Sequence, residues 1–105
     1  MEFQLIIAMN VTDPARYVQY RAAMSPVLAR FGGRFEYDLV VSEVLKSPTP
    51  HPITRFFSIL FPSRQASVDF FANPDYAAAK AAHFGAAVNG FTVVAEIERQ
   101  TKPSV

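Results

Sequence analysis

Two arginines and one tyrosine are the residues in this sequence best suited to hold a small ligand. Arg34 and Arg55 are expected on strands, where a guanidinium can clamp a carboxylate or a phosphate through two parallel hydrogen bonds. Tyr20 falls in an apolar helical pattern and could present its hydroxyl group to a cavity between helix and sheet. A structural interpretation competes with each, because Arg34 shares a strand face with Glu36 and Asp38, and aromatic residues of such a helix usually belong to the core. We therefore treat Tyr20, Arg34 and Arg55 as candidate ligand-binding residues.

Histidine and paired carboxylates could supply acid–base chemistry. Histidine titrates near neutral pH, and the chain has two, His51 in a proline-rich loop and His83 near the end of a helical segment. His83 is the fourth candidate ligand-binding residue, although a positive group there also suits the helix dipole. Glu96 and Glu98 share one strand face, where a solvated or dimer-edge surface is the favoured interpretation. None of these residues identifies a catalytic group.

Composition excludes several classes of function. The 105 residues contain no Cys and no HxH or HExxH spacing, so the sequence predicts no metal site and no cofactor. The four glycines form no phosphate-binding loop, and no GxSxG motif occurs. Ten Lys plus Arg against nine Asp plus Glu give a net charge of +1 without a basic block, which predicts no nucleic-acid partner. The short apolar runs predict neither a membrane span nor a signal peptide, so we expect a cytoplasmic protein.

Hydrophobic periodicity predicts four strands and two helical regions. The strands are expected over residues 3–9, 34–45, 54–61 and 91–99, with a β-bulge near residues 42–45 of the second and a turn at Asn89-Gly90 before the fourth. The first helix is expected from an N-cap at Thr12 or Asp13 to Gly32-Gly33, bent but unbroken at Pro26. The second helical region is expected over residues 63–88, with a restart at Asn73-Pro74.

This order, βαββαβ, predicts one α+β domain over residues 1–105, with an ordered core of about residues 3–99 and a C-terminal tail at residues 100–105. The architecture that suits it is ferredoxin-like: a four-stranded antiparallel sheet with both helical regions on one face. The first and third strands carry large apolar side chains on both faces, although only one can meet the helices. We therefore expect a homodimer formed through the other face of the sheet.

Several short motifs occur in order between about residue 5 and residue 97. They comprise Thr12-Asp13-Pro14 with Tyr17 and Tyr20, residues 29–35, Phe61-Pro62-Ser63, residues 73–76, and Ala78-Ala79. They resemble a family of unknown function, numbered thirteen-thirty, within the dimeric α+β barrels. The resemblance implies that fold and a homodimer but no activity; Arg34 and Arg55 match arginines of the family, whereas Leu60 stands where the family usually has Glu.

Three hypotheses of function remain open. The first is a small dimeric protein that binds a small organic ligand, for instance an anion, in a cavity between sheet and helices. The second, by analogy with dimeric barrels of similar fold, is a cofactor-independent enzyme of the oxygenase or isomerase type. The third is a structural or partner-binding module without a ligand.

Overall fold

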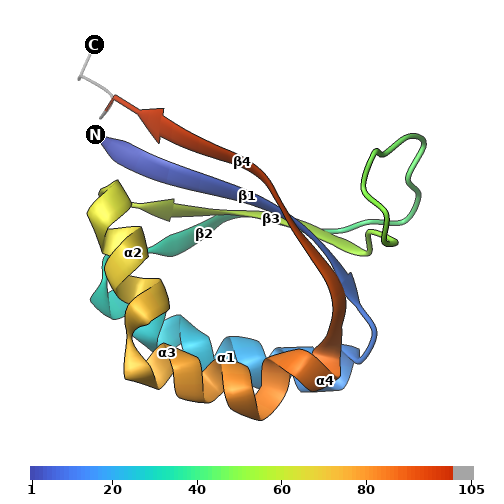
Figure 1. The fold of residues 1–105 in the computed structure, drawn as a ribbon, viewed down its shortest axis with the longest axis horizontal. Helices are drawn as coiled ribbons and strands as arrows, with labels where there is room; N and C mark the ends of the chain where they lie inside the picture. Colours follow the sequence, from blue (N-terminus) through green and yellow to red (C-terminus); the bar gives the residue numbers. More distant parts are fainter. Residues whose placement is uncertain (101–105) are drawn as a thin grey trace.

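A four-stranded antiparallel sheet carries all the helices on one face in the computed structural model, which describes residues 1–100 (Figure 1). The strands are β1 (Glu2–Val11), β2 (Arg34–Val40), β3 (Arg55–Phe61) and β4 (Val88–Arg99), in the order β2-β3-β1-β4. The helical segments are α1 (Pro14–Arg30), α2 (Arg64–Ala72), α3 (Pro74–Ala79), the π-helical η1 (Lys80–Phe84) and α4 (Gly85–Ala87). The predicted ferredoxin-like fold is confirmed. Residues 101–105 of the predicted tail lie outside the described residues.

Helix α1 begins and ends where the sequence predicts. The Asp13 side chain accepts a hydrogen bond from the backbone N–H of Arg16 at 3.1 Å, and Pro14 occupies the first turn, where its missing N–H has no partner to lose. Pro26 lies inside the helix without dividing it. Gly32 then adopts a φ of +74°, a conformation that favours glycine and ends the helix.

A β-bulge in β2 turns its side chains differently from the prediction. The strand ends at Val40 rather than near residue 45, and its pairing with β3 shifts between Phe35 and Tyr37. Glu36 therefore points away from the helices, whereas Asp38 points toward them and pairs with Arg21 of α1. The predicted common face of Arg34, Glu36 and Asp38 is wrong, because simple alternation breaks at the extra residue.

Strand β4 begins earlier than predicted, and its alternation of side chains is interrupted once. It begins at Val88, so the predicted turn at Asn89-Gly90 is part of the strand. Its pairing with β1 shifts at Val94, which has no partner in β1. Phe91 and Val93 consequently face the helices, whereas Ala95 and Ile97, opposite Ile6 and Gln4, face away.

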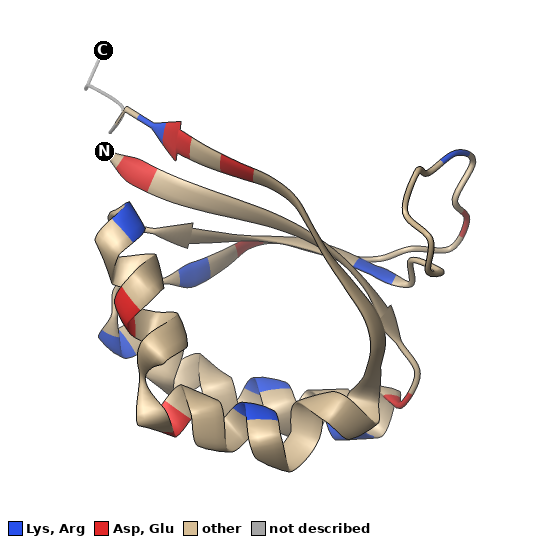
Figure 2. Ribbon diagram, viewed as in Figure 1, with Lys and Arg blue, Asp and Glu red and all other residues tan. Residues whose placement is uncertain are grey.

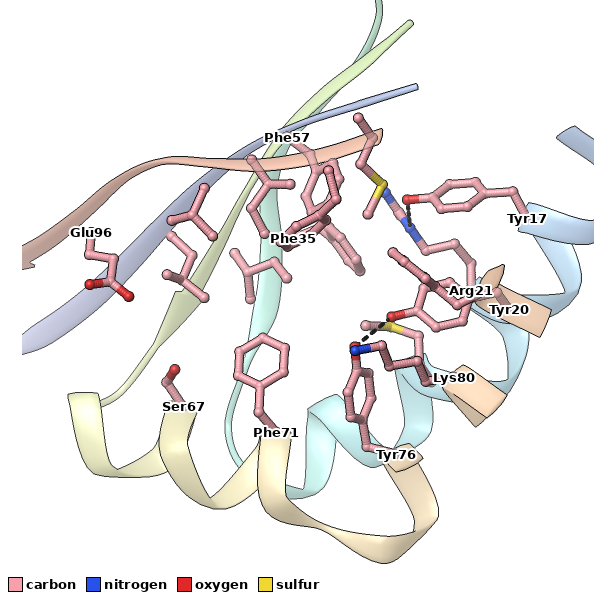
Figure 3. Close-up of a pocket in the computed structure, with 18 of the residues that line it drawn as sticks. Tyr17, Tyr20, Arg21, Phe35, Phe57, Ser67, Phe71, Tyr76, Lys80 and Glu96 are labelled. Atoms are coloured by element: carbon pink, nitrogen blue, oxygen red, sulfur yellow. Dashed lines mark hydrogen bonds between the residues drawn. The ribbon is translucent and has the colours of Figure 1, made fainter. Parts of the chain in front are cut away.

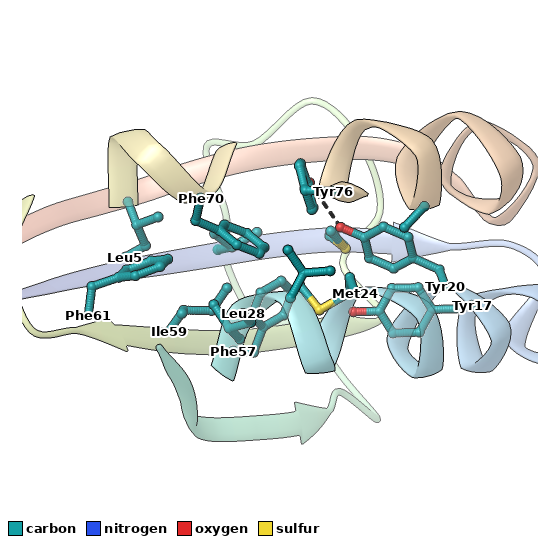
Figure 4. Close-up of a cluster of buried hydrophobic side chains, with 14 of the residues drawn as sticks. Leu5, Tyr17, Tyr20, Met24, Leu28, Phe57, Ile59, Phe61, Phe70 and Tyr76 are labelled. Carbon is teal, nitrogen blue, oxygen red and sulfur yellow. Dashed lines mark hydrogen bonds between the residues drawn. The ribbon is translucent and has the colours of Figure 1, made fainter. Parts of the chain in front are cut away.

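The core lies between the sheet and the helices (Figure 4). Strand β1 contributes Phe3, Leu5, Ile7 and Met9, β3 contributes Phe57, Ile59 and Phe61, α1 contributes Tyr17, Tyr20, Met24, Val27 and Leu28, and Phe70 and Tyr76 come from α2 and α3. These residues cover one face of β1 and β3 and the predicted stripe of α1. They account for the attachment of the helical layer to that face.

The opposite face of the sheet, here called the open face, carries no helix. Its apolar side chains are Ile6, Ala8, Phe56 and Leu60, as the two-sided pattern predicts, together with Leu39 and Ile97. One end is polar, because Gln4 donates to Glu36 at 2.7 Å and Arg99 donates to the same carboxylate at 3.1 Å. The loop over residues 41–54 folds against the other end, where His51 Nε2 lies 2.8 Å from Thr92 Oγ1.

No helix within residues 1–100 combines the length and the apolar character that crossing a membrane requires.

Two glycines allow a direct test of this geometry. A Cβ at Gly90 would lie 2.5 Å from the His51 ring on a backbone with φ of +123°, whereas a Cβ at Gly85 meets nothing within 4 Å. We expect Gly90→Ala to lower the free energy of unfolding by about 2 kcal/mol. The control, Gly85→Ala, should raise it by up to about 1 kcal/mol, because alanine favours the helix. Urea unfolding measures both, and equal effects of the two substitutions would contradict the assigned conformation of β4.

Candidate functional site

A cavity of about 690 Å³ lies between the sheet and the helical layer (Figure 3). The layer is attached to the sheet at both ends. At one end Phe70 is fully buried, with ring centroids of Phe61 and Tyr76 at 5.8 and 4.5 Å; at the other the backbone N–H of Thr12 donates to the carbonyl of Ala87 at 2.9 Å. Between these attachments α2 presents small side chains, including Ser67 and Ala72, which leave the space unfilled.

The wall of the cavity is almost entirely apolar. Its apolar members are Leu5, Ile7 and Met9 of β1, Met24 of α1, Phe35 of β2, Phe57 and Ile59 of β3, Val68, Phe71 and Ala72 of α2, Phe84 of η1, and Phe91 and Val93 of β4. Such a wall suits an apolar ligand, whose orientation is then set by a few polar groups. Those groups are three tyrosines, Ser67 and three charged residues.

Arg21, one of the charged residues, is held by three hydrogen bonds within the protein. Its Nη1 and Nη2 atoms donate to the two carboxylate oxygens of Asp38 at 3.1 and 3.0 Å, and its Nε donates to the Tyr17 hydroxyl at 2.8 Å. The guanidinium also stacks on Phe35, 3.6 Å from the ring centroid. This side chain joins α1 to β2 and forms a rigid part of the wall.

Tyr20 and Tyr76 form a buried hydroxyl pair, with the two oxygens 2.9 Å apart. Burial raises the pKa of Tyr20 far above its ordinary value, and the Tyr76 hydroxyl beside it raises it further. Burial also raises the pKa of Tyr76 and, against the opposing effect of Arg21, that of Tyr17. The pair therefore stays neutral near neutral pH, and its two protons supply one internal hydrogen bond and one that can point outward.

Lys80 and Glu96 are the other charged residues of the wall. Lys80 is exposed, and its Nζ lies 5.7 Å from the Phe84 ring centroid. Within residues 1–100 no carboxylate comes within 4.0 Å of this amino group. Glu96 has Arg64 at 3.9 Å and lies toward the opposite end of the cavity in Figure 3. Lys80 is therefore the wall's cation without an ion-pair partner in the described chain.

Of the four candidate residues from the sequence, only Tyr20 lines the cavity. Arg34 is exposed on the open face, opposite Leu60. Arg55 lies beside the cavity wall, 3.6 Å from Asp38 and with its guanidinium 4.9 Å from the Tyr17 ring centroid. His83 lies in η1, and its buried Nδ1 has no hydrogen-bond partner in the described part of the chain.

Sequence reasoning missed five polar residues of the wall: Tyr17, Arg21, Ser67, Tyr76 and Lys80. For Arg21 and Lys80 the spacing held a signal, because each follows a buried tyrosine by four residues and so shares its helix face. For metals, residues 1–100 contain no group of three His, Asp or Glu residues placed to hold an ion.

The fold and the site define a ferredoxin-like α+β protein with a mainly apolar cavity between its sheet and its helices. The chain belongs to the family described as "Domain of unknown function (DUF1330)", whose model matches residues 4–97. The resemblance seen in the sequence motifs is thereby confirmed. No curated protein matches the chain.

Solved structures share the fold at low sequence identity. A protein of unknown function from Rhodopseudomonas palustris is 21% identical, with a TM-score of 0.77 over 97% of this chain and 84% of that one. SnoaB, a cofactor-independent oxygenase from Streptomyces nogalater, is 20% identical, with a TM-score of 0.58 over 98% of both chains. A dimeric protein of unknown function with a ferredoxin-like fold, from Bacteroides fragilis, is 11% identical, with a TM-score of 0.59 over 93% of this chain and 96% of that one.

The buried tyrosines predict a loss of stability in alkaline solution. Unfolding returns each phenol to its ordinary pKa of 10.0, so above pH 10 the unfolded state binds fewer protons than the folded state and the free energy of unfolding falls. Above pH 10, each tyrosine that stays protonated in the folded state lowers the free energy of unfolding by about 1.4 kcal/mol per pH unit. We expect Tyr20→Phe to reduce this slope by one tyrosine's share in urea unfolding between pH 9 and 11; an unchanged slope would contradict the burial of the hydroxyl.

Proposed function

We propose that this protein binds a small, mainly apolar organic molecule in the cavity between sheet and helices, and that it does so as a homodimer. The observation that carries the first part is the apolar wall around about 690 Å³ in a chain of only 105 residues. Protein interiors are normally close-packed, and apolar space of this size forfeits dispersion contacts that a bound molecule restores. The volume also falls within the usual range of small-molecule sites, roughly 300–1,000 Å³.

An enzymatic role is the second candidate. The fold is shared with a cofactor-independent oxygenase. An enzyme also needs an acid or base beside its substrate, and the titratable side chains on the described wall are three tyrosines, Arg21, Lys80 and Glu96. Glu96 has a cationic neighbour, and His83 does not line the wall. Binding therefore has the stronger support, and oxygen consumption with a bound aromatic compound would separate the two roles.

The open face of the sheet supports the second part of the proposal. Charged residues are absent from the middle of β1 and β3, as Figure 2 shows, and the face exposes Leu39 and Ile97 beside Ile6 and Phe56. Packing two such faces together would remove this apolar surface from water. A structural neighbour from Bacteroides fragilis is described as dimeric. The cytoplasmic location expected from the sequence stays a prediction.

Binding can be measured with a neutral fluorescent probe, N-phenyl-1-naphthylamine, because the chain contains no Trp. We expect its emission to rise on binding to the wild type. Ala72→Trp places a large ring in the cavity wall and should weaken binding about tenfold. Ala78→Trp, on the exposed side of α3, is the matched control and should bind like the wild type. An absence of binding to the wild type would refute the proposed function.

Dimerisation can be measured by sedimentation equilibrium at micromolar concentration. We expect the wild type to have twice the monomer mass of 11.7 kDa. Leu39→Glu places a charge on the open face and should yield the monomer, whereas Val18→Glu, on the exposed side of α1, should leave the dimer intact. A folded wild-type protein of 11.7 kDa would end this part of the proposal.

A further inference from the structure

We propose that the ligand of the cavity is a monocarboxylic acid with an apolar body, and that Lys80 and the Tyr20–Tyr76 pair hold its carboxylate. This inference rests on the proposed function and assigns the chemical class of the ligand. Its support is the distribution of polar groups around the wall, which differs between the two ends of the cavity (Figure 3).

Of the two cations of the wall, Arg21 and Lys80, only Lys80 lacks a carboxylate partner among the described residues. All three nitrogens of Arg21 already donate to Asp38 or to Tyr17, and its ring stacking fixes the side chain in place. The amino group of Lys80 has no carboxylate within 4.0 Å among residues 1–100, although it lines the same cavity. An ammonium group provides three donors and a single positive charge, which matches one carboxylate.

The tyrosine pair lies on the same side of the cavity as Lys80. Tyr76 and Lys80 are four residues apart on the continuous helical run of α3 and η1, and Figure 3 shows both side chains near Tyr20. The hydroxyl–hydroxyl bond uses one of the pair's two protons, and no other partner of either oxygen occurs in the described chain. The remaining proton can be donated to a carboxylate oxygen, which strengthens a charge-assisted contact.

The position of Lys80 at the exposed edge limits the cost of binding a charge. A carboxylate held there keeps part of its hydration, while the apolar body enters the space between Phe35, Phe57 and Phe84. The far end carries Glu96, with Arg64 at 3.9 Å, and no cation of the described wall lies there to receive a carboxylate in the reverse orientation. The charges of the wall therefore define both the class of ligand and its direction.

Two ligands that differ in one group test this assignment. 2-Naphthoate and 2-naphthylmethanol share an apolar body, and each can be titrated against bound N-phenyl-1-naphthylamine. We expect Lys80→Gln to weaken 2-naphthoate about tenfold and to leave 2-naphthylmethanol unchanged, because only the carboxylate makes the charged contact. Lys80→Arg should restore most of the affinity for 2-naphthoate. Lys46→Gln, in the loop over residues 41–54, is the matched control and should have no effect.

The outcomes separate this inference from the proposed function. If the neutral probe and 2-naphthylmethanol bind the wild type but Lys80→Gln does not selectively weaken 2-naphthoate, the carboxylate assignment is wrong and the binding function stands. If neither the probe nor either naphthalene compound binds, the proposed function fails and the assignment fails with it. Selective weakening by Lys80→Gln, with recovery in Lys80→Arg, supports both.

Discussion

The attachment of the helical layer at two separate ends is the constraint on which the rest of this structure depends. Aromatic packing around Phe70 holds α2 against β3, and hydrogen bonds to the Ala87 carbonyl hold the start of α1 against α4. Between these two ends the sheet and the helical layer enclose the cavity, and its chemistry depends on the side chains that line it.

Two β-bulges decide which charges reach that interior. The bulge at Glu36 turns Asp38 toward α1, where its carboxylate binds Arg21 and also has Arg55 at 3.6 Å. The bulge at Val94 interrupts the alternation of β4, so that Glu96 follows Phe91 and Val93 on the cavity side. Without it, Ala95 and Ile97 would continue the same face and this end of the cavity would carry no charge. One inserted residue in each strand therefore changes the electrostatics of the site.

The order of elements could be predicted from the sequence because each has a strong local signal. The apolar stripe of α1, the glycines after it and the restart at Asn73-Pro74 all depend on neighbouring residues. The bulge predicted near residues 42–45 is misplaced and the one at Val94 was not predicted, since bulge positions depend on pairing with β3 and β1, which are distant in sequence. Tyr20, a candidate from its helix pattern, lines the cavity, whereas Arg34, a candidate from its place on a strand, lies on the open face. Lys80 and Tyr76 could not be predicted as cavity residues, because their place in the wall depends on how α3 and η1 pack against the sheet.

Three consecutive residues of β4 make contacts on both faces of the sheet. Thr92 binds His51 of the loop over residues 41–54, and its neighbours Phe91 and Val93 form part of the cavity wall. Successive side chains of a strand point in opposite directions, so the two contacts lie back to back on one stretch of backbone. A displacement of this loop would therefore be transmitted to the cavity wall through one short stretch of β4.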